Sequence, residues 1–138
     1  MTVHAYTDGA SRGNPGESGI GILAKDEEGN VLLSASGYIG RTTNNLAEYT
    51  ALLALLKRVK TLNCSRLIVH SDSELMVKQM RGEYRIKNEE IRGYQEKIQR
   101  ILSKSPFEFE ILHIPREMNG EADALANRGI DSRKRIRI

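Results

Sequence analysis

Four acidic residues stand out because of where they fall in the chain. Asp8 ends the segment 3–8, in which successive side chains are predicted to face opposite sides of a strand. Asp72 directly follows the apolar run 66–71, and Asp123 lies near the start of the last helical segment. Glu48 lies within an apolar helical segment, and the residues three and four positions from it include no lysine or arginine. A buried, unpaired carboxylate costs several kcal/mol or shifts its pKa, so a metal ion is the favoured compensation for Glu48.

Asp8 and Asp72 are each predicted to end a hydrophobic strand. Open α/β sheets bind ligands beyond the carboxyl ends of their strands, so both side chains are expected on one rim of the sheet. Oxygen ligands without a His/Cys cluster favour Mg²⁺ or Mn²⁺ over zinc. Two such ions can activate water and stabilise a leaving oxygen in phosphoryl transfer. For Asp8 taken alone, a solvated turn carboxylate is the favoured interpretation, whereas for Glu48 it is not.

The segments that must position these residues alternate between strand and helix patterns. Hydrophobic alternation and short β-rich runs predict strands over 3–8, 19–25, 31–40, 66–71 and 107–114. Apolar residues at three- and four-residue steps predict helices over 43–62, 73–80 and 88–104 and from Asn119 onward. The glycine-rich stretch 9–18 is expected to be a turn. This order predicts an α/β fold with a mixed sheet and helices on its faces.

Length and composition indicate the number of domains, the cellular compartment and the kind of partner. A chain of 138 residues is expected to form one domain, and no apolar run approaches the roughly 20 residues of a membrane span. The N-terminal residues lack a secretion-signal pattern, and the single cysteine, Cys64, cannot form an internal disulfide. These features predict a cytoplasmic protein without membrane association. The net charge of +3 suggests an anionic partner.

Four segments resemble the motifs of the ribonuclease H type 1 family, in the family's order and at its spacing. They are Thr7–Gly16, Thr42–Tyr49, His70–Met80 and His113–Asn127, and together the resemblance covers about the whole chain. Each segment supplies one of the four carboxylates, which makes the combination far more specific than any one motif. The resemblance implies a ribonuclease H-like fold with five strands in the order 3-2-1-4-5, the first three antiparallel, and helices on both faces.

The resemblance also implies an activity, namely metal-dependent endonucleolytic hydrolysis of the RNA strand of an RNA–DNA hybrid, leaving 3′-hydroxyl and 5′-phosphate ends. Asp8, Glu48, Asp72 and Asp123 match the family's metal-binding carboxylates. Two ions, Mg²⁺ or Mn²⁺, are implied, one activating water and the other stabilising the departing 3′-oxygen. Glu48 is also implied to lie beside the 2′-hydroxyl. The expected partner is the hybrid, with double-stranded RNA as a further possibility, and the chain is expected to be a monomer.

The substrate-binding positions follow from the same resemblance. The positions that match family readers of the 2′-hydroxyl are Gly9, Asn14, Asn44 and Asn45. Arg41 and Thr43 match a site that holds a phosphate of the DNA strand. A turn for Asn14 and a helix N-cap for Thr43 or Asn44 are the structural alternatives. A helix N-terminus attracts phosphate, so capping and binding are compatible.

The chain departs from the family pattern in two places. Many members carry a basic protrusion where residues 81–88 form only a short turn, so the chain resembles the compact, archaeal-like branch. His113 has the family's spacing to Asp123, but it ends a predicted strand that Pro115 follows. In the compact branch Arg116 is implicated in activity. We therefore assign Arg116 the role near the departing phosphate and favour a packed or edge position for His113.

The basic surplus lies at the C-terminal end. Residues 128–138 hold five basic residues and one acid, whereas the other 127 residues hold 16 basic and 17 acidic residues. The expected division is therefore a catalytic domain, 1–127, and a basic tail, 128–138, that supplies the phosphate contacts of the missing protrusion. The alternatives are a frayed terminus or an edge strand formed by the Arg-Ile alternation of residues 135–138.

Three other functions compete with the nuclease. A catalytically weak module that only binds hybrid or double-stranded RNA is disfavoured because all four carboxylates are present. A transposase or integrase core is disfavoured by the Asn44-Asn45 pair and by the Asp-Gly sequence at Asp8. A fragment of a reverse transcriptase is disfavoured because the first predicted strand follows directly after Met1.

Overall fold

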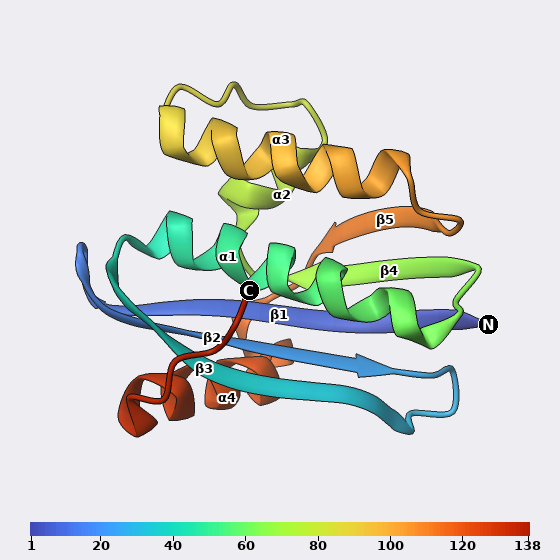
Figure 1. Ribbon diagram of the computed structural model, residues 1–138, viewed down its shortest axis with the longest axis horizontal. Coiled ribbons are helices and arrows are strands. Elements are labelled where there is room, and N and C mark those ends of the chain that lie inside the picture. The colour runs from blue at the N-terminus through green and yellow to red at the C-terminus, as the bar shows by residue number, and fades with distance from the viewer.

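The computed structural model describes residues 1–138 and contains one five-stranded sheet (Figure 1). The strands are β1 (Thr2–Gly13), β2 (Gly16–Lys25), β3 (Val31–Thr42), β4 (Arg66–Ser71) and β5 (Glu108–His113). Their order in the sheet is β3-β2-β1-β4-β5. The first three strands pair antiparallel, and β4 and β5 run parallel to β1. The expected sheet order and strand directions are thus confirmed.

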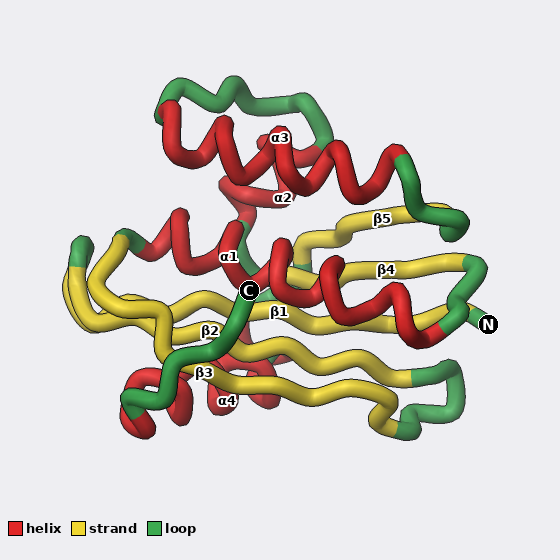
Figure 2. Tube along the Cα trace, in the orientation of Figure 1, coloured by secondary structure: helices red, strands yellow, loops and turns green.

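Four helices lie on the two faces of this sheet (Figure 2). They are α1 (Asn44–Val59), α2 (Glu74–Met80), α3 (Glu89–Ser103) and α4 (Gly120–Ser132), with 3₁₀ turns at Lys60–Leu62 and Arg116–Met118. The helix α1 packs between the sheet and α3, whereas α4 covers β1, β2 and β3 on the opposite face. None of these helices has the length and apolar character that crossing a membrane requires.

The core is centred on α1, which is buried nearly all round, as its sequence predicts. Tyr49, Leu52, Leu55 and Leu56 are at most 1% exposed. Burying a leucine side chain contributes about 2 kcal/mol, so this helix is held firmly against the sheet. Thr43 caps its N-terminus, because the Thr43 hydroxyl accepts a hydrogen bond from the Leu46 amide. The N-cap expected at Thr43 or Asn44 is therefore found at Thr43.

The expectation of a glycine-rich turn over residues 9–18 is wrong. The strand β1 continues to Gly13 and β2 begins at Gly16, and their antiparallel pairing runs to the Gly13–Gly16 pair. Within this stretch Gly9 lets a helix approach closely rather than letting the chain turn. A Cβ at Gly9 would lie 2.2 Å from the Ala47 carbonyl carbon in α1. Close packing of α1 on β1 therefore explains this glycine.

The last helix crosses the expected boundary between the catalytic domain and the tail. Residue 127, the expected end of the catalytic domain, lies inside α4, which continues to Ser132. Beyond it, Arg135 forms a parallel bridge with Tyr38 on the edge strand β3. The chain then ends beside α1 (Figure 1, red). Of the alternatives for the tail, edge pairing at residue 135 is the one observed.

Candidate active site

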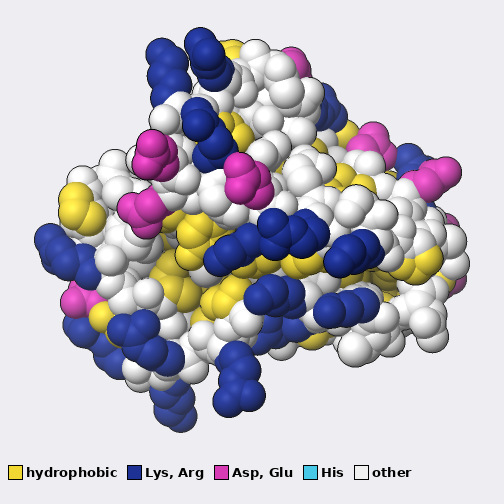
Figure 3. Space-filling view, turned by 45° about the horizontal axis from the view of Figure 1, so that its top comes forward, with side chains coloured by type: hydrophobic (Ala, Val, Ile, Leu, Met, Phe, Trp, Pro, Cys, Tyr) yellow, Lys and Arg dark blue, Asp and Glu magenta, His cyan; other side chains and the backbone are white.

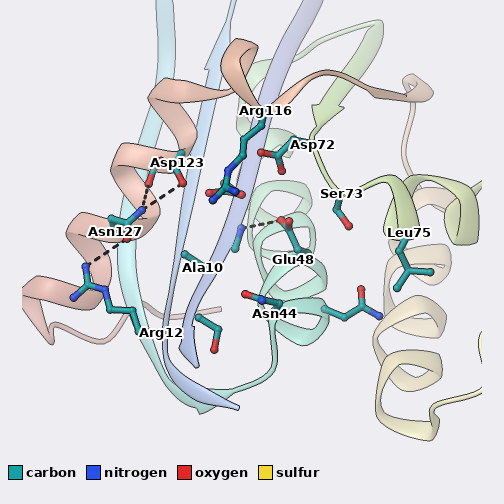
Figure 4. Close-up of a pocket in the computed structure, with 14 residues that line it drawn as sticks. Ala10, Arg12, Asn44, Glu48, Asp72, Ser73, Leu75, Arg116, Asp123 and Asn127 are labelled. Atoms are coloured by element: carbon teal, nitrogen blue, oxygen red, sulfur yellow. Dashed lines mark hydrogen bonds between the residues drawn. The ribbon is translucent and has the colours of Figure 1, made fainter. Parts of the chain in front are cut away.

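Three carboxylates meet where β1, α1 and β4 come together (Figure 4). Asp8 lies within β1, Glu48 in the first turns of α1, and Asp72 directly after β4. One carboxylate oxygen of each lies within 4.8 Å of the others. Asp8 and Glu48 are 5% and 8% exposed, and Asp72 is half-buried. Asp123 of α4 lines the same cavity but lies outside this three-residue cluster.

Gly9 fixes the position of Glu48 relative to Asp8. The Gly9 amide donates a hydrogen bond of 2.8 Å to Glu48 Oε1. The same glycine admits the backbone of α1 at residue Ala47, as its missing Cβ shows. A strand residue with any side chain would push α1 away, and Glu48 would move away from Asp8 with it.

Burial and mutual repulsion raise the pKa values of the cluster. Burial, followed by the charges of Asp72 and Asp123, raises the pKa of Asp8 to about 8. Burial and then the charge of Asp8 raise the pKa of Glu48 well above its ordinary value. Burial also raises the pKa of Asp72, although the Arg116 guanidinium opposes this shift. Near neutral pH, the metal-free cluster therefore retains protons that a bound cation would displace.

The cavity that holds the cluster has a volume of about 470 Å³ and is lined mostly by polar side chains. The three clustered groups that could hold a cation are carboxylates, and the lining contains no histidine or cysteine. Such a set suits a hard divalent ion rather than zinc. Asn45 Oδ1 is also buried and has no hydrogen-bond partner. The residues present thus fit a divalent cation, and Asp8, Glu48 and Asp72 are the residues that would hold it.

The structure distinguishes Arg116 from His113, the two residues considered for a role near the departing phosphate. Arg116 lines the cavity, and its side chain extends into the space between Asp123 and Asp72 (Figure 4). Its charge lowers the pKa of all three clustered carboxyl groups. His113 is exposed at the end of β5 and does not line the cavity.

The predicted substrate-binding residues fall into two neighbouring groups. Gly9, Asn44 and Asn45 line the active-site cavity. Asn14 does not line it, but its Oδ1 accepts a hydrogen bond of 3.1 Å from the Asn44 amide. Arg41 lies outside and lines a second cavity of about 310 Å³ together with Thr42. Thr43, between the two groups, is the N-cap of α1.

Two asparagines that the sequence analysis did not single out hold Asp123 and the strand beside it. Asn119 is 1% exposed, and its Nδ2 donates to the Thr7 carbonyl over 3.0 Å. The Asn119 carbonyl also accepts from the Asp123 amide over 3.0 Å. Asn127 lines the cavity, and its Nδ2 donates to the Asp123 carbonyl over 3.0 Å. The spacing of four residues on either side of Asp123 was the available signal, because such residues share a helix face.

Comparison with known proteins assigns the chain to one structural family. Residues 6–129 match a family model described as reverse transcriptase-like. Ribonuclease HI of Halobacterium salinarum is 37% identical over 129 residues, which are 94% of this chain and 64% of that protein. The bifunctional protein Rv2228c of Mycobacterium tuberculosis is 35% identical over 96% of this chain and 36% of its own length. The chain thus spans less than two thirds of these relatives.

A solved structure gives the same answer. The crystal structure of LC11-RNase H1 in complex with RNA/DNA hybrid has a TM-score of 0.91 and 42% identity, covering 94% of this chain and 97% of that one. These matches extend over nearly all of the sheet and helices described above. The chain belongs to the ribonuclease H type 1 family.

Proposed function

We propose that this chain is a metal-dependent endonuclease that hydrolyses the RNA strand of RNA–DNA hybrids and leaves 3′-hydroxyl and 5′-phosphate ends. The observation that carries the proposal is the buried cluster of Asp8, Glu48 and Asp72 in an open polar cavity. Carboxylates held together at such a cost need a cationic partner, and divalent cations promote phosphodiester hydrolysis. The RNA/DNA hybrid bound in the LC11-RNase H1 structure supports this substrate class.

Membership in the family implies dependence on a divalent metal, and the acidic cluster offers the ligands. We propose two Mg²⁺ or Mn²⁺ ions, held by Asp8, Glu48, Asp72 and Asp123. When bound, such ions lower the pKa of water and neutralise charge on a leaving oxygen. Asp123, which lies outside the three-residue cluster, would then supply a ligand from α4.

The remaining residues bind and orient the substrate. The Arg116 guanidinium, whose charge acts on Asp72, is proposed to bind the scissile phosphate and its departing oxygen. Asn44 and Asn45 present amide groups to the same cavity and are proposed to read the 2′-hydroxyl, with Gly9. Arg41 and Thr43, at the N-terminus of α1, are proposed to hold a phosphate of the DNA strand.

The proposal is tested with three end-labelled duplexes of one sequence: RNA–DNA hybrid, RNA duplex and DNA duplex. Each is incubated with the protein in Mg²⁺, in Mn²⁺ and in EDTA. We expect cleavage of the hybrid's RNA strand, only with metal, and products that carry a 5′-phosphate. Hybrid binding without cleavage would show a binding module instead, and cleavage of duplex DNA would show a strand-transfer nuclease.

We propose further that the chain acts as a monomer in a reducing compartment such as the cytoplasm, since its one cysteine, Cys64, is buried and free. Sedimentation equilibrium at micromolar concentration tests the first part, and a dimer would contradict it. We also propose that residues 1–127 hold every group needed for hydrolysis and that the basic residues after them serve binding.

A further inference from the structure

The chain after α4 forms an ordered segment, residues 133–138, which we call the strap. Its backbone pairs with the edge strand β3: the Tyr38 amide donates to the Lys134 carbonyl over 2.9 Å, and the Ile136 amide donates to the Tyr38 carbonyl over 3.3 Å. The strap thereby covers part of the open edge of the sheet.

Residues of α1 hold the far end of the strap. Arg58 Nη2 donates to the Arg137 carbonyl over 2.6 Å, and Lys57 Nζ donates to the Ile138 carbonyl over 3.3 Å. The strap therefore passes around the edge strand, from α4 on one face of the sheet to α1 on the other (Figure 1).

Alternating side chains of the strap face opposite ways. Ile136 and Ile138 are half-buried and pack against the core, whereas Arg135 and Arg137 are exposed. Ile136 sits directly on Gly37, where a Cβ would lie 2.2 Å from the Ile136 Cβ. A two-residue period with apolar residues inward is the pattern of a docked strand, and it presents the arginines to solvent.

Two acids near the strap, Asp131 and Glu17, already pair with other arginines, which leaves Arg135 and Arg137 without a carboxylate partner. Asp131, the one acid near it in sequence, pairs with Arg12 at 2.6 Å, and Arg133 pairs with Glu17 at 3.5 Å. Neither Arg135 nor Arg137 forms an ion pair. Figure 3 shows Lys and Arg side chains in rows across the face that the strap crosses, with apolar side chains between them.

Arg135 lies beside the proposed phosphate site. It lines the cavity of about 310 Å³ that Arg41 also lines, and Glu90 is the one acid in that lining. The Arg135 guanidinium lies against Gly40, where a Cβ would be 3.1 Å from Nη2, and its carbon is 5.3 Å from the Tyr38 ring centroid. Two unpaired guanidinium groups in one cavity repel each other, and an anion relieves that repulsion.

The two cavities adjoin along one short stretch of chain. Residues 41 and 42 line the second cavity, and residues 44 and 45 line the active-site cavity. A polymer with a negative charge at each repeat can therefore occupy both at once. This continuity favours a nucleic-acid backbone over a separate acidic partner.

We propose that the strap is a second backbone-binding element, in which Arg135 and Arg137 bind phosphates of the strand that Arg41 holds, beyond the site of cleavage. This inference rests on the proposed function for the identity of the substrate. It assigns to residues 133–138 a part in substrate affinity and none in the hydrolytic step.

The test compares R135Q/R137Q with the control variant R100Q/K104Q, which removes the same charge from exposed positions on and just after α3. Hybrid cleavage is measured at several salt concentrations. Each lost phosphate contact lowers the slope of log KM against log salt by about 1, so we expect a decrease of about 2 for the strap variant, with kcat unchanged. We expect no change of slope for the control.

Equal slopes for the strap variant, the control and the unmodified protein would overturn the proposal. A fall in kcat without a change in slope would do the same, because it would place the strap in the hydrolytic step. If the unmodified protein cleaves no hybrid, the proposed function fails by itself, and fluorescence anisotropy of labelled hybrid then gives the salt slopes separately. Thermal unfolding of both variants checks that the strap remains docked.

Discussion

The acidic cavity and the basic strap are built in opposite ways. The three clustered carboxylates of the cavity come from three distant segments, and two of them, Asp8 and Glu48, are buried with raised pKa values. The basic groups of the strap come from one continuous segment and remain exposed. Burial destabilises the ionised form of a group and shifts its pKa. An exposed charge keeps its hydration, and salt screens its interactions. Changes in the cavity should therefore alter kcat and pH dependence, and changes in the strap should alter KM and salt dependence.

The largest effect is expected from removing one carboxylate of the cluster. Asp72→Asn removes a proposed metal ligand, and a loss of several kcal/mol of transition-state stabilisation corresponds to about a 10³-fold decrease in kcat. Circular dichroism should show an unchanged fold, because the carboxylates repel one another without metal. Glu96→Gln, at an exposed site on α3, is the matched control. Near-normal turnover of Asp72→Asn would remove the basis for the metal site.

The next largest effect separates Arg116 from His113. Arg116→Ala should lower kcat by about 100-fold, because the cavity loses the cation that is proposed to bind the scissile phosphate. His113→Ala should leave kcat within about twofold, since His113 does not line the cavity. Single-turnover cleavage of the hybrid measures both variants. The reverse result, with His113 essential and Arg116 dispensable, would exchange their roles.

The raised pKa values predict how stability depends on pH in the metal-free protein. Folding raises the pKa of Asp8 from 3.8 to about 8, so between these values the folded state binds a proton that the unfolded state has released. The free energy of unfolding should therefore fall as pH rises from about 4 to about 8, by about 2 kcal/mol or more from this group. Urea unfolding across this range measures it.

Two variations sharpen the pH experiment. Asp8→Asn cannot titrate, so its stability should change less with pH than that of the unmodified protein. Saturating Mn²⁺ should reverse the trend, because deprotonation then favours binding. If the free energy of unfolding of the metal-free protein does not change from pH 4 to 8, then folding does not raise the pKa of Asp8.

The smallest effect concerns the asparagine that anchors α4. Asn119→Ala leaves the Thr7 carbonyl without its side-chain donor, and an unsatisfied buried group costs about 1–3 kcal/mol. We expect lower stability in urea and a modest decrease in kcat. Asn119 is bonded to Thr7, the residue before Asp8, and its carbonyl accepts the amide of Asp123, so its loss should disturb both aspartates. Asn127→Ala, at a half-exposed position, should cost less. Equal stability of both variants would mean that Asn119 does not anchor the helix.

The sequence predicts the fold and the acidic centre because both depend on local signals. Apolar periodicity places α1, and a glutamate without a basic neighbour inside that helix indicates a group that needs compensation. The strand order that brings Asp8 and Asp72 to one cavity is implied by the resemblance of their motifs to the ribonuclease H type 1 family. The sheet order, the family and the burial of Glu48 agree with those predictions.

The features that the sequence does not predict depend on contacts between distant segments. Gly9 looks like a turn residue until α1 is seen to pack on it. The hydrogen bond from Asn119 to the Thr7 carbonyl joins positions 112 residues apart, so no local sequence pattern predicts it. Arg and Ile alternate in the sequence of the strap, but only the structure shows that it pairs with β3 at Tyr38.

The most direct test of the central claim is calorimetric titration of the metal-free protein with Mn²⁺ at pH 7, in two buffers of different ionisation enthalpy. Raised pKa values of Asp8 and Glu48 predict that Mn²⁺ binding releases protons, and that Glu48→Gln both weakens binding and reduces the release. Mn²⁺ binding with equal affinity and no proton release in both proteins would contradict the account, since the ion would then lie elsewhere.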